Sequence, residues 1–279
     1  MARVIAVASN KGGVAKTTTC LSLGGSLAEA GQLALLIDLD PQAHLTSSLG
    51  VEPTTLRRTV CDVLLGQKSI VAASQESAVK NLDIVPANRE LVVLDKVLYN
   101  RPGYEYRLKA SLDQMYHELY DTVLVDCPPS FGALTINALT AADLLIIPVQ
   151  CEYYAARSLR QMLDMVSRIR QSSNARLSYR VLVTMFDMRN KVHRLILMHL
   201  RARFRAALLQ TVIQVDTRLR ESPAFGMPVT HYAPRTRAAA QYRELARELI
   251  ADQPIALAIQ APPSGENTVT ARKTITSLP

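Results

Sequence analysis

The feature that most constrains the fold of this chain is a glycine turn between an apolar run and a helical pattern, close to the N-terminus. Residues 4–8 are all apolar, Gly12 and Gly13 follow in the turn, and apolar residues then recur at spacings of three and four between positions 20 and 28. A strand, a glycine turn and a helix in this order are typical of a phosphate-binding loop, because the backbone N–H groups at the start of the helix point toward an anion. The glycines let the backbone approach that anion closely.

Two lysines and a threonine supply the side chains that such a loop uses. Lys16 is placed to reach the β- and γ-phosphates of a nucleotide, and the hydroxyl of Thr17 is placed to ligate Mg²⁺. The strict pattern G-x-x-x-x-G-K-[ST] is not met, because Asn10 and Ala15 occupy its glycine positions. The segment has the pattern K-G-G-x-x-K-T instead, with Lys11 as an additional lysine. Taken alone, it also fits a plain Gly-Gly turn with two solvated lysines.

A second apolar run, residues 33–37, is followed at once by two aspartates, Asp38 and Asp40. The helical pattern over residues 17–30 joins the two runs, which makes a βαβ unit. Ligands of open α/β sheets bind at the carboxyl ends of the strands. We therefore expect Asp40 to orient an attacking water and Asp38 to support the Mg²⁺ shell, with turn capping before Pro41 as the alternative.

Asp126 ends a third apolar run, residues 122–126. A carboxylate in this position holds Mg²⁺ directly or through water in many nucleotide-binding proteins. The stiff turn over residues 127–130 then serves as a switch that senses the γ-phosphate. The alternative is that Asp126 merely caps the turn.

Strand and helix patterns alternate through the rest of the chain. Strands are expected over residues 82–86, 143–149, 179–184 and 211–213, and helices over residues 88–99, 104–119, 155–171, 191–209 and 235–251. Continuously apolar strands favour a parallel sheet that is covered on both faces. The sequence predicts one doubly wound, mostly parallel α/β domain with helices on both faces over residues 1–252, and a flexible tail over residues 253–279.

Composition places the chain among soluble globular proteins, with 48% hydrophobic and 20% charged residues. No apolar run approaches the roughly 20 residues of a membrane span. No signal segment and no C-x-x-C motif occur, which indicates a cytosolic protein. Residues 155–248 hold 18 of the 32 Lys and Arg residues but only 6 of the 24 Asp and Glu residues. This asymmetry favours a polyanionic partner, with solvated helix faces as the alternative.

The motifs together resemble those of the ParA/Soj family of partition ATPases. The resemblance runs from about residue 3 to residue 251 and rests on seven stretches in order: 11–18, 38–42, 125–130, 134–139, 148–153, 184–187 and 218–223. No long extension precedes the loop, so the chain is most similar to the short, Soj-like branch.

The resemblance implies an Mg²⁺-dependent ATPase with a deviant Walker A loop, which hydrolyses ATP to ADP and phosphate and dimerises around two ATP molecules. Lys11 matches the lysine that reaches the nucleotide of the other subunit. The implied catalytic residues are Lys11, Lys16 and Asp40, and the implied metal-binding residues are Thr17, Asp38 and Asp126. The implied nucleotide contacts are Lys11, Gly12, Gly13, Val14, Ala15, Lys16, Thr17, Thr18, Met185, Phe186 and Gln214.

The resemblance also implies partners and a location. The ATP-bound homodimer would bind double-stranded DNA without sequence preference, and a ParB-like or adaptor protein would stimulate hydrolysis. The process served is chromosome or plasmid partition, or the positioning of another cargo, in the cytoplasm at the nucleoid and without a membrane. The basic residues at the implied DNA-contacting positions are Arg189, Arg218, Arg220, Arg235 and Arg237.

Three departures from the family pattern are visible, one of which is a tail after residue 252 that is longer than usual. Ala15 stands where glycine is common, so we expect a negative φ angle at that residue. Gln214 stands where a Pro-Arg-Asn segment usually lies near the adenine.

Three other functions compete with partition. A membrane-associated division-site ATPase of the MinD kind would need a C-terminal amphipathic helix, which residues 254–279 do not indicate. A nitrogenase-like iron protein would need paired cysteines, which the cysteine spacing does not match. A metabolic P-loop ligase or kinase would need a substrate pocket.

Overall fold

The computed structural model describes residues 2–115, 119–153 and 155–251, and it contains an eight-stranded sheet with the order β3-β4-β2-β5-β1-β6-β7-β8. Every neighbouring pair is parallel except β3 and β4, which are antiparallel. The predicted doubly wound, mostly parallel sheet is confirmed. The strands are β1 Arg3–Val7, β2 Ala34–Asp38, β3 Gln75–Glu76, β4 Leu82–Val85, β5 Thr122–Asp126, β6 Leu144–Gln150, β7 Ser178–Phe186 and β8 Leu208–Gln214.

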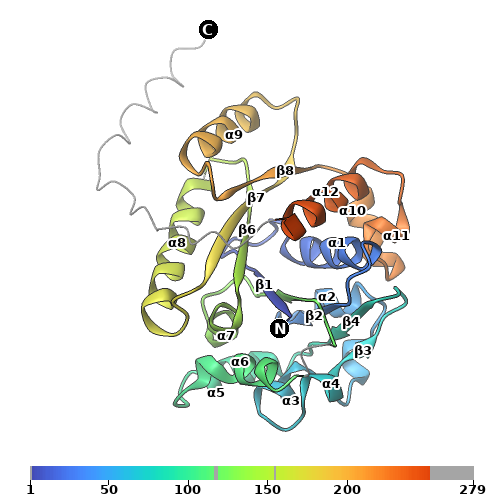
Figure 1. Cartoon of the computed structure of the whole chain (residues 1–279), viewed down its shortest axis with the longest axis vertical. Coiled ribbons are helices and arrows are strands. Elements are labelled where there is room, and N and C mark those ends of the chain that lie inside the picture. Colours follow the sequence, from blue (N-terminus) through green and yellow to red (C-terminus); the bar gives the residue numbers. More distant parts are fainter. Residues whose placement is uncertain (1, 116–118, 154, 252–279) are drawn as a thin grey trace.

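Helices cover both faces of this sheet (Figure 1). The α-helices are α1 Lys16–Glu29, α2 His44–Ser47, α3 Val60–Leu64, α4 Ile70–Ala73, α5 Leu91–Leu98, α6 Arg107–Asp113, α7 Ala133–Ala141, α8 Ala155–Ser172, α9 Lys191–Arg203, α10 Arg218–Glu221, α11 Val229–Tyr232 and α12 Arg237–Ala251. Short 3-10 helices span Pro53–Thr55, Tyr104–Tyr106 and Ser222–Phe225. Among the described residues, no helix is both long enough and apolar enough to cross a bilayer.

Alternation along the strands divides the buried side chains into two cores. In β1, Val4 and Ala6 belong to the core under α3 and α5 to α9, whereas Ile5 and Val7 belong to the core under α1 and α12. The central strands β2, β5 and β6 alternate in the same way, because successive side chains of a strand point to opposite faces. Burial on both faces explains why these strands are continuously apolar in the sequence.

The central strands end together at one edge of the sheet. In the pairing register, Val7 of β1 and Asp38 of β2 both lie opposite Asp126 of β5. The loop that follows β1 therefore starts beside both strand-end aspartates. This common edge is where ligands of open α/β sheets bind.

The helix expected near the C-terminal end of the domain is too long. The helix expected over residues 191–209 ends at Arg203, and β8 begins at Leu208. Arg205 consequently does not share a helix face with Arg194 and Arg201. Pairing with β7 decides this segment, since the N–H of Val181 donates to the carbonyl of Ala207 at 2.7 Å, and such long-range pairing overrides local helix propensity. Between β8 and α11, the chain forms α10 and a 3-10 helix.

The β8 edge of the sheet is closed by side chains of α12. The carboxylate of Glu248 accepts the N–H groups of Gln210 at 2.6 Å and Thr211 at 3.0 Å. The side-chain oxygen of Gln241 accepts the N–H of Gln214 at 3.0 Å. At the other end of the domain, the expected tail over residues 253–279 lies outside the described residues, so the boundary at residue 252 stays a prediction.

Candidate nucleotide-binding site

The loop between β1 and α1 is shaped by two residues in the left-handed region. Gly13 has a φ of 75° and Ala15 a φ of 65°. Our expectation of a negative φ at Ala15 is therefore wrong. The left-handed turn at Ala15 is the step at which the loop enters α1, and its carbonyl accepts the N–H of Thr19 at 2.9 Å. A Cβ at Gly12 or Gly13 would meet no atom within 4 Å, so the loop surrounds open space.

Lys16 at the start of α1 carries a buried ammonium group. Its side chain belongs to a residue that is only 7% exposed, and Nζ has a hydrogen bond of 3.4 Å to the carbonyl of Lys11. A buried ammonium with one long hydrogen bond is costly unless a negative group joins it. The start of a helix supplies further positive potential at the same place. The loop therefore fits a phosphate.

Two fully buried carboxyl groups, Asp38 and Asp126, lie next to this loop. The hydroxyl of Thr17 donates to Oδ2 of Asp126 at 2.6 Å, and Oδ1 of Asp126 has no hydrogen-bond partner among the described residues. Asp38 accepts the N–H of Asp40 at 3.0 Å and both the N–H and the hydroxyl of Thr46. An orphaned carboxylate oxygen beside a threonine hydroxyl fits a hard divalent cation such as Mg²⁺.

Burial raises the pKa of both carboxyl groups. The pKa of Asp38 rises to about 6, mainly through burial and with a contribution from the charge of Asp40. The pKa of Asp126 is raised well above its ordinary value, first by burial and then by the charge of Asp38. A cation at this point would reverse both effects, since it favours the ionised form.

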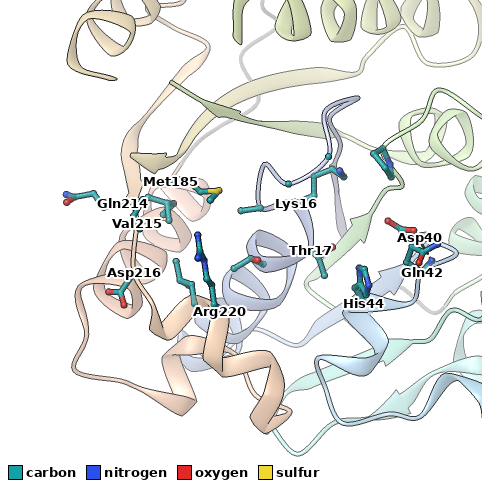
Figure 2. Close-up of a pocket in the computed structure, with 17 residues that line it drawn as sticks. Lys16, Thr17, Asp40, Gln42, His44, Met185, Gln214, Val215, Asp216 and Arg220 are labelled. Atoms are coloured by element: carbon teal, nitrogen blue, oxygen red, sulfur yellow. Dashed lines mark hydrogen bonds between the residues drawn. The ribbon is translucent and has the colours of Figure 1, made fainter. Parts of the chain in front are cut away.

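A cleft of about 480 Å³ opens above the loop, a size that suits a nucleotide. Figure 2 shows Lys16 and Thr17 in its middle, with Met185 and Gln214 on one side and Asp40 on the other. Nine residues predicted for the nucleotide site line it: Gly12, Gly13, Ala15, Lys16, Thr17, Thr18, Asp40, Met185 and Gln214. The sequence reasoning did not assign the lining residues Gln42, His44, Pro129, Ile213, Val215, Asp216 and Leu219 to the nucleotide.

Three predicted nucleotide contacts do not line the cleft. Val14 is buried beneath the loop, where its carbonyl accepts the hydroxyl of Thr184 at 3.1 Å. Phe186 is buried and packs against the ring of His193, with 5.9 Å between the ring centroids. The side chain of Lys11 pairs with the carboxylate of Glu152.

Gln150, at the carboxyl end of β6, is a site residue that the sequence reasoning missed. Its Nε2 donates to the carbonyl of Gly13 at 3.0 Å and to the sulfur of Met185 at 2.5 Å, and its Oε1 accepts from Nζ of Lys11 at 3.3 Å. Gln150 thus ties the loop to the wall of the cleft. Its place at the end of a central strand was the signal that could have revealed it.

The predicted DNA-contacting arginines lie in three different places. Arg189 forms an ion pair with Asp187 at 3.0 Å, and Arg237 donates to the carbonyl of Val215 at 2.9 Å. Arg220, by contrast, lines the nucleotide cleft.

Arg218 and Arg235 line a shallow pocket together with Tyr232. Arg218 also forms an ion pair with Glu221 at 2.5 Å. All five predicted arginines are exposed.

The site combines three features. The loop between β1 and α1 has residues with left-handed φ angles, a buried lysine lies at its end, and two carboxyl groups lie at neighbouring strand ends. Together they define a P-loop nucleotide-binding protein with a doubly wound sheet. A family model described as an AAA domain matches residues 2–179. The sporulation initiation inhibitor protein Soj of Bacillus subtilis is 40% identical over 253 residues, which cover 90% of this chain and 100% of Soj. The chromosome partitioning protein ParA of Caulobacter vibrioides is 40% identical over 250 residues, 89% of this chain and 94% of that protein. The chain belongs to the ParA/Soj family, as the motifs predicted.

Solved structures share the fold of this chain. A Mycobacterium smegmatis protein named cobyrinic acid a,c-diamide synthase, solved with ADP and magnesium, is 38% identical with a TM-score of 0.78 and covers 90% of this chain and 94% of its own. McdA of Cyanothece, at 23% identity and a TM-score of 0.80, shares the fold. It covers 90% of this chain and 100% of its own.

Proposed function

We propose that this protein is an ATPase that dimerises with ATP, binds double-stranded DNA without sequence preference and drives chromosome or plasmid partition or the positioning of another cargo. The observation that carries the proposal is the placement of the two loop lysines. Lys16 lies in the cleft, whereas Lys11 stands outside it. A lysine that its own cleft does not use is available to a nucleotide in a second subunit, where it would offset phosphate charge only in the dimer.

ATP and Mg²⁺ are the cofactors that fit the cleft. Lys16 and the N–H groups of the loop would hold the phosphates, and Thr17 with Asp126 would hold Mg²⁺. Bound Mg²⁺ supplies neutralisation of phosphate charge. Asp40 lines the cleft, and its Oδ1 accepts the N–H of Gln42 at 2.9 Å. Its other carboxylate oxygen is left to orient a water for hydrolysis.

Binding of DNA rests on the basic C-terminal part of the domain. Arg189, Arg218, Arg235 and Arg237 are exposed and come from segments near the same end of the sheet as the cleft. Arg220 lies where that surface meets the cleft. Clustered cations that contact phosphates give affinity without sequence preference, and the affinity falls with salt.

The test is DNA binding by the purified chain with ATP, with ADP and without nucleotide, over a range of salt. We expect binding with ATP alone, a steep decrease with salt, and a loss in the variants Arg189→Glu and Arg218→Glu. Asp40→Ala should bind ATP and DNA but fail to hydrolyse ATP. Intact DNA binding in both arginine variants would refute the basic surface, and normal hydrolysis by Asp40→Ala would refute the role of that carboxylate.

The partner and the location follow from the same proposal. A ParB-like or adaptor protein would stimulate hydrolysis in the DNA-bound homodimer, so that ATP acts as a timer in the cytoplasm at the nucleoid. A candidate partner, encoded beside this chain's gene, should raise the ATPase rate only when DNA is present.

The name of the Mycobacterium smegmatis structures raises a second candidate, an ATP-dependent amide synthase. Incubation with ATP, cobyrinic acid and an ammonia donor, followed by mass spectrometry, separates the two functions. Formation of the diamide in the absence of any DNA binding would replace partition with synthesis. DNA binding with ATP and no diamide would reject the synthase.

A further inference from the structure

The outer face of α9 exposes large apolar side chains that the nucleotide site does not use. Val192 is 55% exposed, Leu195 51% and Met198 56%, and Met188 just before the helix is 59% exposed. Single exposed apolar residues are ordinary, but neighbouring ones on one surface mark an interaction site.

The helix itself is firmly held, so these side chains are not exposed by fraying. Leu197 and Leu200 on its opposite face are buried in the core beneath β7 and β8. Leu195, Met198 and Ala202 follow at spacings of three and four and form the outermost line of the helix. The outermost line of α9 is therefore an apolar ridge about two turns long.

Cations surround this ridge, and the segment that carries it contains no Asp or Glu. Residues 188–205 contain six basic residues and no Asp or Glu: Arg189, Lys191, Arg194, Arg201, Arg203 and Arg205. Apart from Arg189, none of them forms an ion pair with another described residue. In helical projection, Arg194 and Arg201 flank the ridge on one side and Arg203 flanks it on the other.

We propose that α9 is a docking surface for an acidic amphipathic helix of a partner protein. Such a helix would lay apolar residues on Leu195 and Met198 and place carboxylates beside the flanking arginines, which is the usual geometry of helix recognition. Charge complementarity selects the occupant. A DNA backbone would satisfy the cations but would leave the apolar ridge against phosphates. A membrane surface would also accept a basic helix with leucine on its apolar face, so the vesicle measurement below separates that occupant from an acidic helix.

The helix that carries the docking surface contacts the segment that leads into the wall of the nucleotide cleft. His193 of α9 accepts the N–H of Asp187 at 3.0 Å and packs on Phe186, the neighbour of Met185 in the cleft wall.

Synthetic peptides test the surface directly. The probe is a fluorescent helical peptide of about 18 residues with leucines along one face and glutamates on both sides of them. One control peptide has lysines in place of the glutamates, and another has serines in place of the leucines. We expect the full chain to bind the probe at least about tenfold more tightly than either control.

A matched pair of protein variants locates the binding. Leu195→Ser with Met198→Ser should weaken probe binding about tenfold, because two apolar contacts are lost. The control is Val92→Ser with Val93→Ser, which alters the equally exposed Val92 and Val93 of α5 and should have no effect. All four positions are exposed, so the variants should fold. DNA binding with ATP should persist in the α9 variant, which keeps this test separate from that of the proposed function.

Four results would overturn the proposal. The first is equal affinity for the glutamate and lysine peptides, and the second is unchanged probe binding in the α9 variant. The third is that the α9 variant loses binding to anionic phosphatidylglycerol vesicles. The fourth is that the α9 variant loses self-association. The last two would assign the ridge to a membrane or to a second copy of the chain.

Discussion

Ala15 adopts a backbone conformation that alanine rarely takes. Its φ of 65° places the Cβ close to the following carbonyl, which costs roughly 1–2 kcal/mol for a residue other than glycine. This strained residue lies at the turn where the loop enters α1, beside the buried Lys16. Strain of this kind persists where the surrounding structure fixes the backbone, and it is common at binding sites.

Replacement of Ala15 by glycine should therefore stabilise the protein. We expect Ala15→Gly to raise the free energy of unfolding by about 0.5–1 kcal/mol, because relief of strain exceeds the added entropy of the unfolded chain. Ala30 has a φ of −76°, so Ala30→Gly is the matched control and should lower stability instead. Urea unfolding of both variants measures the difference. A loss of stability in Ala15→Gly would contradict the left-handed conformation.

The raised pKa values of Asp38 and Asp126 predict how the metal-free protein responds to pH. The pKa of Asp38 is about 6 in the folded chain and near its ordinary low value after unfolding, so the folded state holds an extra proton between these values. The free energy of unfolding should fall as pH rises through this window. The decrease should continue above it as Asp126 ionises, because its pKa is raised still further.

Asp126→Asn removes one of the two buried charges while it keeps the shape of the side chain. Without metal at pH 8, we expect this variant to be more stable than the unaltered protein by about 1–3 kcal/mol. The difference should shrink as the pH falls, because the raised pKa of Asp126 favours its protonated form. Urea unfolding in EDTA at several pH values checks both statements, and a variant less stable at pH 8 would contradict the raised pKa of Asp126.

Helices α5 and α7 meet through a contact that leaves no room for a side chain. The carboxylate of Asp95 accepts the N–H of Leu134 at 3.0 Å, and a Cβ on Gly132 would lie 2.4 Å from the same carboxylate. Asp95 thus caps α7, the helix that follows the expected switch segment. Gly132→Ala should lower the free energy of unfolding by about 2 kcal/mol, because the cap is displaced.

A double-mutant cycle distinguishes this steric cause from a general effect of the substitution. Asp95→Ala removes the carboxylate, so the further change Gly132→Ala should then cost much less than it does in the unaltered chain. Thermal or urea unfolding of the four proteins gives the coupling energy. Additive costs would show that Asp95 and Gly132 do not compete for space.

The elements that the sequence predicted best are those whose environment is uniform. The strands β2 and β5 are buried on both faces, so their residues form unbroken apolar runs that end at Asp38 and Asp126. The error at α9 and β8 has the opposite origin. The segment after Arg203 has no glycine or proline to end a helix, and its structure is decided by pairing with β7, which is remote in the sequence.

The parts of the candidate site that lie within short sequence motifs were predictable. The loop and the strand-end aspartates carry their chemistry within short motifs, and the cleft brings Lys16, Thr17 and Asp40 together. The conformation of Ala15 and the contacts of Gln150 could not be derived, because both depend on how distant strands place the loop. The family resemblance supplied Gln214, which no local pattern indicates.

In the proposed ATP-bound dimer, Lys11 would reach the nucleotide of the second subunit, whereas the single chain holds it in an ion pair with Glu152. Under the proposed function this pair competes with the nucleotide of the second subunit. Glu152→Gln should therefore promote dimerisation with a non-hydrolysable ATP analogue, by about fivefold in concentration, since an exposed ion pair contributes up to about 1 kcal/mol.

Analytical ultracentrifugation measures this shift. Lys11→Ala should prevent the dimer, and Asp113→Asn, which breaks the exposed ion pair of Asp113 with Lys109, should change nothing. Weaker dimerisation of Glu152→Gln would mean that Glu152 is itself part of the contact between subunits.

The closed edge at β8 limits how copies of this chain can join. An open edge strand recruits the backbone of another molecule and leads toward fibrils. Here the N–H groups of Gln210, Thr211 and Gln214 are already taken by Glu248 and Gln241. Local crowding of many copies, at any site where the protein accumulates, therefore does not favour growth by strand addition at this edge. Copies of the chain that meet at this edge do so through side-chain contacts, and such contacts are reversible.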